Sequence, residues 1–559
     1  MSFLDQWLDP SRRFERTYAD QIARRYRFML WPLARVDLAR DWIEPRGLRA
    51  ALTQNARVVI TGAPGAGKTT ALAYLAMANA RGQDRRARVP IFLAARELQS
   101  QVLPRIPDLP RGLNLSDALA VQCPRIYFPT VFKARRALVL IDDADALTPE
   151  QLNIWQKDFA DATIIATARA ALPGFTEFAL PGLRDSDIEI FARRMENPSA
   201  FFAALKNAPR ALTANPFTLT MLTRIWREGE PLPTRRTDLF DSYAQLVLGG
   251  QDDVAKSLET LALAIQNGRA GSNELLSKSR GLLRAAKNRT AEFVHELWQA
   301  YFAGRALRNN AEQTVVFERM ADARWEDALL FYAGLGDARA FADSAFARGD
   351  VYFAGRILAH ARDARADLRD AVTEELVGRV WNGDARAARV LAEMNSDVAV
   401  DRFAAKLKDK DPAVRTRAAE ILGALQLDRG IEYLLPQLRD VNADVRDQVV
   451  AALGCARTNR VIEPLLVALR GDARVGHIDT RLRIAAARAL GAVGSDRAVP
   501  ALLVDLQVGE PEVRAVAADA LKQITSPLMA KPLHALLQSE DELTRQYATE
   551  ILALVNGKN

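Results

Sequence analysis

One glycine-rich stretch carries residues of the types and spacing needed to bind a phosphate chain. It reads Gly-x-x-x-x-Gly-Lys-Thr, and its candidate phosphate-binding residues are Gly62, Pro64, Gly65, Gly67, Lys68, Thr69 and Thr70. In such a loop, backbone N–H groups face the phosphates, the lysine ammonium neutralises the outer phosphates, and the next hydroxyl group binds Mg²⁺. This stretch therefore predicts binding of ATP or ADP with Mg²⁺.

A second group of residues supplies carboxylates and a cation for the same chemistry. Asp142, Asp143 and Asp145 follow an apolar run, and Asp142 is the candidate partner of Thr69 in holding Mg²⁺. These neighbouring carboxylates repel one another, and a divalent cation would relieve that repulsion. Arg169 ends another apolar run and is the candidate sensor of the γ-phosphate. The alternatives are an acidic turn that only caps the next helix, and a solvated loop arginine.

These side chains need a parallel sheet to bring them together. Short β-branched and apolar runs predict strands at 58–60, 89–93, 137–141 and 162–169, and an apolar run after the loop predicts a helix from residue 71. Strand, glycine-rich loop and helix form the full context of a phosphate loop. Because ligands gather at the C-terminal edge of an open parallel sheet, we expect the loop, Asp142 and Arg169 at that edge.

The order of these features resembles the NACHT subfamily of STAND signalling ATPases. The matching stretches are Val58–Thr70, Val89–Leu98, Leu138–Leu147, Leu180–Asp185, Asn215–Leu219 and Phe293–Arg305. The last two are similar to the family's N-P-hydrophobic-x-L and F-x-H-x-x-x-Q-E-x-x-A-A patterns. The resemblance implies that Pro216 lies against the adenine and that His295 binds the β-phosphate of ADP and holds a closed state. A structural role is the alternative for His295.

The chain departs from the family pattern near the second acidic position. Asp143 stands where the family has a small residue, Ala146 replaces its final glutamate, and Ala300 replaces the glutamate after Gln299. Asp145 keeps the family's second aspartate, which implies a role in polarising the attacking water. The missing acid bears on the rate of hydrolysis and not on nucleotide binding, so we expect a slow ATPase.

The C-terminal third is a repeat array. A Val-Arg-x-x-Ala-Ala-x-x-Leu-Gly pattern recurs on the arginines Arg415, Arg446, Arg483, Arg514 and Arg545, with an insertion near 471–480 and weaker copies back towards residue 340. Each arginine opens an apolar helix that follows a partner helix. Helix pairs at a fixed period stack into a solenoid, because one pair cannot bury its own apolar face. The pattern resembles short HEAT-like repeats, and we expect an unknown protein ligand on them.

Two basic segments raise the question of nucleic-acid or membrane contact. Residues 12–27 hold six arginines and two acids, with aromatic and apolar residues at every fourth position, which predicts an amphipathic helix ending near Trp31-Pro32. It could bind an anionic membrane or an acidic partner, or pack its aromatic stripe on the following domain. The basic run 278–289 could touch nucleic acid or be a solvated face.

Composition narrows the class of protein. The 559 residues are 49% hydrophobic and 26% charged with a net charge of +7, which is ordinary for a globular chain of several domains. Two distant cysteines and four scattered histidines argue against a disulfide framework or a metal centre built from them. The first residues lack the basic flank and apolar core of an export signal, and no apolar run is long enough to span a membrane. We expect a cytoplasmic protein.

The predicted fold is a multidomain α/β + α chain with a P-loop NTPase core and an α-solenoid. Its expected segments are a basic helical segment at 1–50, the NTPase core at 51–180, a helical lid at 181–240, a winged-helix region at 241–310 and the solenoid at 311–559. The favoured function is an ATPase switch in defence or regulatory signalling, with a repeat sensor, self-association on activation and a possible separate effector. The alternatives are an AAA+-like remodelling ATPase acting on nucleic acid or protein, and a HEAT scaffold with a silent nucleotide site.

Overall fold

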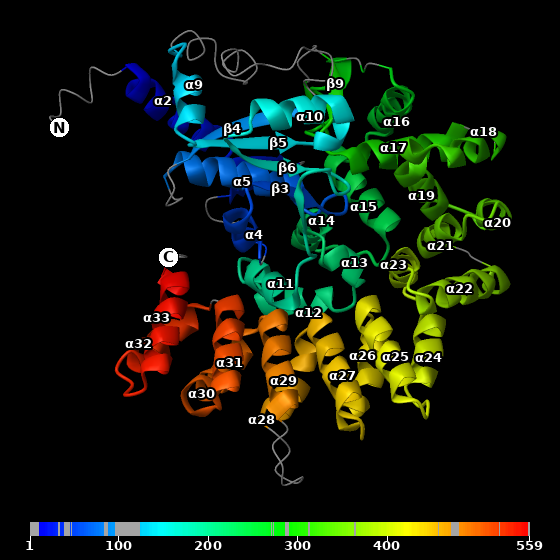
Figure 1. Cartoon of the computed structure of the whole chain (residues 1–559). Helices are drawn as coiled ribbons and strands as arrows, with labels where there is room; N and C mark the ends of the chain where they lie inside the picture. Colours follow the sequence, from blue (N-terminus) through cyan, green and yellow to red (C-terminus); the bar gives the residue numbers. More distant parts are fainter. Residues whose placement is uncertain are drawn as a thin grey trace. The chain divides into compact units, whose positions relative to one another are not determined.

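The computed structural model contains two compact units, each built from segments that are distant in the sequence (Figure 1). The first comprises Met1–Gly182, Asn215–Arg227 and Ser242–Gln299, and the second comprises Leu183–Ala214, Glu228–Asp241 and Ala300–Asn559. The structure describes residues 10–31, 34–38, 45, 47–82, 88–95, 123–269, 271, 273–285, 290–310, 313–362, 365–456, 458–470, 480–524 and 526–556. The units cut across the five segments expected from the sequence, which stay a prediction.

A five-stranded parallel sheet forms the centre of the first unit, in the order β4-β5-β6-β3-β7. Its strands are β3 (Arg57–Thr61), β4 (Val89–Ala94), β5 (Ala137–Asp142), β6 (Thr163–Thr167) and β7 (Thr176–Ala179). The four predicted strands are therefore confirmed, although β6 ends at Thr167 and leaves Arg169 in the following loop. Strand β7, an edge strand with mostly exposed residues, was not expected from the sequence. One consequence of the strand order is that β6 separates β3 from β5.

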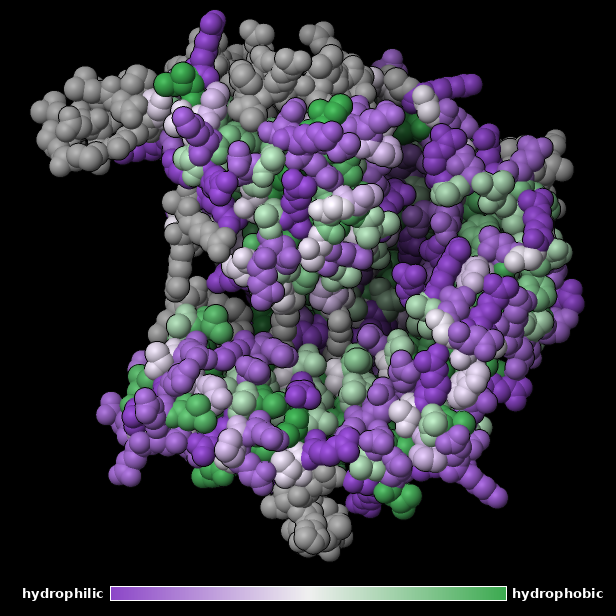
Figure 2. Space-filling model, in the orientation of Figure 1, coloured by the Kyte–Doolittle hydropathy of each residue, from purple (hydrophilic) through white to green (hydrophobic). Residues whose placement is uncertain are grey.

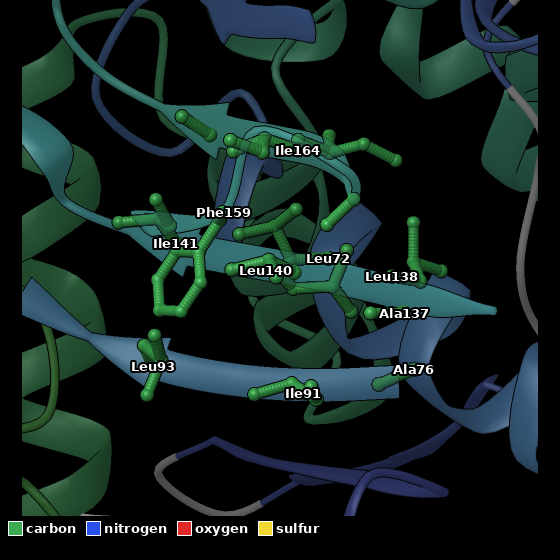
Figure 3. Packing of buried hydrophobic residues seen from close by; sticks show 14 of the residues in the cluster. Leu72, Ala76, Ile91, Leu93, Ala137, Leu138, Leu140, Ile141, Phe159 and Ile164 are labelled. Carbon is green, nitrogen blue, oxygen red and sulfur yellow. The ribbon is translucent and has the colours of Figure 1, made fainter. Parts of the chain in front are cut away.

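The sheet and the helix after the phosphate loop share one apolar core. That helix, α5 (Lys68–Ala80), buries Leu72 and Ala76 completely, and Figure 3 shows both beside Leu140 of β5 and Ile91 of β4. The helices α4 (Leu48–Gln54), α9 (Tyr127–Lys133) and α10 (Pro149–Asp158) also belong to this part of the unit. Thr148 begins α10 with a capping box to Gln151, which fixes the chain direction after the acidic turn.

The basic N-terminal helix packs on this core. Helix α2 (Pro10–Arg25) buries the predicted stripe of Phe14, Tyr18 and Ile22, and the Tyr18 hydroxyl donates a 2.6 Å hydrogen bond to the Pro90 carbonyl oxygen. Of the two readings of this helix, the structure therefore supports packing of the aromatic stripe. The expected helix end near Trp31 is wrong. The helix ends at Arg25 because the next residues pair as an antiparallel hairpin, β1 (Phe28–Trp31) with β2 (Ala34–Asp37).

The remaining segments of the first unit are mostly helical. They comprise α14 (Pro216–Arg227), most of α15 (Arg236–Leu248), α16 (Asp252–Gln266), the antiparallel hairpin of β8 (Leu283–Ala285) and β9 (Ala291–Phe293), and the start of α17 (Glu296–Asn310). In the basic run at 278–289, Arg284 forms an ion pair with Glu292 across this hairpin. Lys287 and Arg289 lie outside the described residues, as does the Arg96–Leu98 part of the family resemblance.

The second unit is a helical array, as the repeat pattern predicts. It begins with α11 (Asp185–Ala192), α12 (Pro198–Leu205) and α13 (Arg210–Thr213). The array proper comprises α18 (Gln313–Glu318), α19 (Glu326–Gly334), α20 (Arg339–Ala347), α21 (Val351–His360), α22 (Ala366–Trp381), α23 (Ala385–Glu393), α24 (Asp397–Lys406), α25 (Pro412–Leu425), α26 (Asp428–Leu434), α27 (Ala443–Cys455), α28 (Ile462–Arg470), α29 (Thr480–Val493), α30 (Val499–Val508), α31 (Pro511–Ile524), α32 (Ala530–Leu536) and α33 (Glu542–Asn556).

The repeat pattern has a packing explanation. A Cβ added to Gly423 on α25 would lie 2.6 Å from the Cβ of Ala452 on α27, and the equivalent distance from Gly454 to Ala489 on α29 is 2.9 Å. The pattern glycine of one repeat therefore approaches the alanine that directly precedes the pattern leucine of the next, at a distance that no larger residue allows. The pattern arginine links repeats as well, since Arg415 is paired with Asp440 through two hydrogen bonds of 2.7 and 2.8 Å.

The surface of the repeats is mainly polar. Figure 2 shows hydrophilic residues over most of the visible face, with apolar residues interspersed. Exposed apolar side chains on or next to the repeat helices include Val467, Val504, Val508 and Leu528. Within the described part of the chain, no helix is both long enough and apolar enough to cross a membrane.

Candidate nucleotide-binding site

The phosphate loop runs from the end of β3 to the start of α5 and contacts the start of α14. Gly65 has a φ of +78°, and a Cβ at this position would lie 2.7 Å from the Cβ of Phe217 and 2.9 Å from Oδ1 of Asn215. Both the backbone angle and the close approach therefore require glycine here. Asn215 also fixes the loop, because its Nδ2 donates a 3.0 Å hydrogen bond to the Pro64 carbonyl oxygen.

Lys68 is the first residue of α5 and points back over the loop. Its Nζ donates hydrogen bonds to the carbonyl oxygens of Gly62 at 2.8 Å and Ala63 at 3.2 Å. Burial lowers the pKa of the ammonium, and the carboxylate of Glu296 is the strongest group acting in the opposite direction. The cation is thus held among loop carbonyls, at the N-terminal end of a helix, where an anion is favoured.

Asp142 ends β5 and is buried, with 9% of its surface exposed. Its Oδ1 accepts hydrogen bonds from the hydroxyl groups of Thr69 at 3.0 Å and Thr167 at 2.6 Å. The predicted pairing of Thr69 with Asp142 is therefore present in the geometry. Thr167 is a residue that the sequence analysis missed. It ends β6, and because β6 lies between β3 and β5, its hydroxyl reaches the carboxylate at the end of β5.

The strand order also explains the turn after Asp142. Asp143 has a φ of 54°, in the left-handed region, and its backbone N–H donates a 2.9 Å hydrogen bond to the Thr167 hydroxyl. The family's small residue at this position suits such a backbone. Aspartate is one of the few other residue types that adopt this conformation readily, so the departure from the family pattern keeps the turn.

Arg169 lies in the loop after β6, between two carboxylates. Its Nε is 3.8 Å from Oδ2 of Asp145, and its Nη2 is 2.5 Å from Oε2 of Glu296. The guanidinium is 58% exposed, so solvent screens these attractions in part. The structure thus brings two separately predicted site residues, Arg169 and Asp145, together and adds Glu296, which was not expected from the sequence.

His295 immediately precedes α17 and lies against α14. Its ring stacks on Phe217, with centroids 4.1 Å apart and planes at 28°. Its Nδ1 accepts a 3.0 Å hydrogen bond from the backbone N–H of Leu297, so the neutral ring carries its proton on Nε2. Pro216, the first residue of α14, precedes Phe217. The contacts of Gly65 with Phe217, and of Phe217 with His295, connect the loop to the histidine.

The donor set fits a nucleotide and its cation. A glycine-rich loop at a helix N-terminus and a lysine suit phosphate, and a buried carboxylate beside a threonine hydroxyl suits Mg²⁺, which prefers oxygen ligands. All the predicted site residues belong to the first unit, although they come from three separate segments of the chain. No cluster of three or more histidines, cysteines or acids able to hold a metal alone occurs among the described residues.

Comparison with known families agrees with this geometry. The NACHT domain family matches residues 56–196, which include the phosphate loop, Asp142 and Arg169. The chain contains a NACHT NTPase domain. Such a domain binds nucleotide, as the loop predicts. HEAT repeats match residues 370–454 and 462–554, so the NACHT domain is followed by C-terminal HEAT repeats.

Solved structures similar to this NACHT protein have low TM-scores and low sequence identity. An engineered protein has 21% sequence identity and a TM-score of 0.24, covering 37% of this chain and 96% of its own. Human deoxyhypusine hydroxylase in complex with glycerol has 18% identity and a TM-score of 0.17, covering 38% of this chain and 98% of its own. A designed armadillo repeat protein has 17% identity and a TM-score of 0.22, covering 36% and 97%. No curated protein matches the sequence.

Proposed function

We propose that this NACHT protein is a STAND-type signalling switch controlled by adenine nucleotide. ATP or ADP binds through the phosphate loop and Lys68, and Thr69 and Asp142 hold Mg²⁺. Pro216 lies against the adenine and His295 meets the β-phosphate. The cation, when bound, neutralises phosphate charge. The HEAT repeats are the sensor, and a protein ligand on them changes the preferred state. The output is self-association, in defence or regulatory signalling through a separate effector.

The division of the chain between its two units is the main support for this proposal. The phosphate loop, Asn215 and His295 belong to the first unit, whereas the helices α11 to α13 belong to the unit of the HEAT repeats. Ala214 and Asn215 are consecutive residues, so the repeat unit is covalently joined to the residue that holds the loop at Pro64. A rearrangement of the repeat unit would therefore displace Asn215 through this peptide bond and so change the phosphate loop.

The same residues support slow hydrolysis at most. Asp145 is the candidate group for polarising water, and its Oδ2 lies 3.8 Å from Nε of Arg169. Ala146 supplies no second acid. Slow hydrolysis suits a switch, because the protein then stays in its ATP-bound state long enough to self-associate.

The decisive experiment is to identify and measure the nucleotide in the purified full chain. We expect bound ADP or ATP, released on denaturation, and loss of binding in Lys68→Ala, because the lost ammonium cannot be replaced by water at equal energy. Lys133→Ala, an exposed lysine at the end of α9, is the control with the same charge change. Undiminished affinity in Lys68→Ala would overturn the assignment. Rapid turnover stimulated by DNA would instead indicate a remodelling ATPase, and an empty site without affinity would indicate a scaffold.

A further inference from the structure

Glu296 forms an ion pair with Arg169 and acts electrostatically on Lys68. Its carboxylate oxygen Oε2 lies 2.5 Å from Nη2 of Arg169, closer than the 3.8 Å between Arg169 and Asp145. It is also the carboxylate that most strongly favours the charged form of Lys68. One side chain therefore supplies counter-charge to Lys68, which the proposed function assigns to the phosphates, and to Arg169, the candidate sensor of the γ-phosphate.

The position of Glu296 in the chain fixes this arrangement. It is the first residue of α17 and follows His295 directly, so the stacking of His295 on Phe217 anchors the backbone beside it. Its side chain is 26% exposed, which leaves it only partly screened by solvent. A carboxylate in the first turn also agrees with the direction of the helix dipole.

We propose that Glu296 makes this site prefer ADP over ATP, by occupying Arg169 and by repelling a third phosphate. The inference rests on the proposed function, and on the expectation from the sequence that Arg169 senses the γ-phosphate. ATP must exchange the Glu296 carboxylate for its own terminal phosphate at Arg169, and it brings further negative charge towards that carboxylate. ADP lacks the third phosphate and leaves the ion pair of Arg169 with Glu296 in place. Glu296 is therefore a specificity-determining residue, distinct from the phosphate loop.

The test compares the affinities of Mg²⁺–ADP and of Mg²⁺ with a non-hydrolysable ATP analogue by titration calorimetry on the nucleotide-stripped full chain. Glu296→Gln keeps the shape of the side chain and removes its charge, so the ratio of ATP-analogue to ADP affinity should rise roughly 3- to 20-fold. Glu296→Asp keeps the charge and should stay within about 2-fold of the parent. Glu292→Gln is the matched control, because it removes an equal charge from a glutamate that is paired with Arg284 on the hairpin.

Each outcome has a definite reading. A rise in the ratio for Glu296→Gln alone supports the inference. An unchanged ratio in Glu296→Gln, with both nucleotides bound, overturns the inference and leaves the proposed function intact. An equal rise in Glu296→Gln and Glu296→Asp would assign the effect to packing and overturn the charge mechanism. A parent chain that binds neither nucleotide would overturn the proposed function and this inference together.

Discussion

The side-chain amide of Asn459, in the turn between α27 and α28, donates a 2.7 Å hydrogen bond to Oε1 of Glu189 on α11. The backbone N–H of Asn459 donates a further 3.0 Å hydrogen bond to Oδ2 of Asp185, at the start of the same helix. These two contacts attach α11, which lies within the segment that matches the NACHT family, to a turn of the HEAT repeats, 270 and 274 residues away in the sequence.

The first prediction concerns this attachment. Asn459→Ala should remove the hydrogen bond to Glu189 and weaken the docking of α11 by about 1 kcal/mol, since the backbone bond to Asp185 remains. Asn459→Asp should weaken it further, because it places a third carboxylate beside Glu189 and Asp185. Hydrogen exchange of the α11 amides should be faster in the order parent, Asn459→Ala, Asn459→Asp. Equal protection in all three would show that the contact does not hold the helix.

The second prediction tests Thr167 as a positioning residue for Asp142. Thr167→Val keeps the shape of the buried side chain but removes the hydroxyl that bonds both the Asp142 carboxylate and the Asp143 amide. The apparent Mg²⁺ affinity, measured in the presence of nucleotide, should fall about 10-fold. Thr163→Val, at the other end of β6, is the control and should have the parental affinity. A change limited to thermal stability would reduce Thr167 to a structural role.

The third prediction separates close approach from backbone angle. Gly65→Ala meets Phe217 and Asn215 and also strains a φ of +78°, so it should impair nucleotide binding severely. Gly82→Ala has a similar φ of +68° but meets nothing within 4 Å, so it should cost only about 1 kcal/mol of stability and leave binding unchanged. Calorimetric titration and thermal unfolding of both variants check this. Comparable binding defects would show that contact with Phe217 is unimportant.

Sequence patterns specified the parts of the fold that depend on neighbouring residues. The phosphate loop, the buried strands β3 to β6 and the helix pairs of the repeats are each coded within a few tens of residues. The sequence predicted a longer helix α2 than the structure contains, because the basic amphipathic pattern continues to Arg27. The helix ends earlier because the following residues form strand β1, which pairs with β2. Strand β7 escaped notice, since its exposed edge position leaves no apolar run.

The residues that the sequence analysis missed depend on contacts between distant segments. Thr167 supports Asp142 only because β6 lies between β3 and β5. The order of the strands in the sheet cannot be predicted from the sequences of the individual strands. Glu296 reaches Arg169 across 127 residues of sequence. A glutamate directly after the histidine, at the start of α17, does not by itself indicate such a contact. A charged residue directly beside a predicted ligand was the available clue.

The fourth prediction concerns a charged cluster in the repeat unit. Burial alone would raise the pKa of Glu393, but the hydrogen bond and charge of His360 and the charge of Arg356 outweigh it and lower the pKa to about 2. A depressed pKa means that Glu393 stabilises the fold above its ordinary pKa and loses this contribution as pH falls towards about 2. Glu393→Gln should therefore cost about 2–3 kcal/mol near neutral pH, and the cost should shrink below about pH 4.5.

Urea denaturation of the parent and Glu393→Gln at pH 7, 5 and 3.5 measures this difference. Glu375→Gln serves as the control, because Glu375 forms an exposed pair with Arg379 one turn away and should change stability by only about 0.3 kcal/mol. A cost for Glu393→Gln that is the same at all three pH values would show that the ion pairs of Glu393 do not supply its contribution.

The last prediction returns to the switch. A ligand shifts a two-state protein only if it binds the two states with different affinity. If ADP bridges Lys68 and the Nε2–H of His295, it stabilises only the arrangement that holds both residues together. His295→Ala should then cost about 1–3 kcal/mol of ADP binding and shift the protein roughly 5–150-fold towards its open form. His295→Ala should release ADP faster than the parent. In the presence of ATP, and without the protein ligand, light scattering should detect a larger species.

A second variant distinguishes the imidazole hydrogen bond from ring packing. His295→Phe keeps a ring against Phe217 but has no N–H donor, and it also loses the acceptor for the Leu297 amide. If the hydrogen bond to phosphate matters, His295→Phe should behave like His295→Ala in ADP retention and in self-association. If His295→Phe keeps ADP as tightly as the parent and stays monomeric, the histidine acts only by packing on α14, and control of the switch must lie elsewhere in the site.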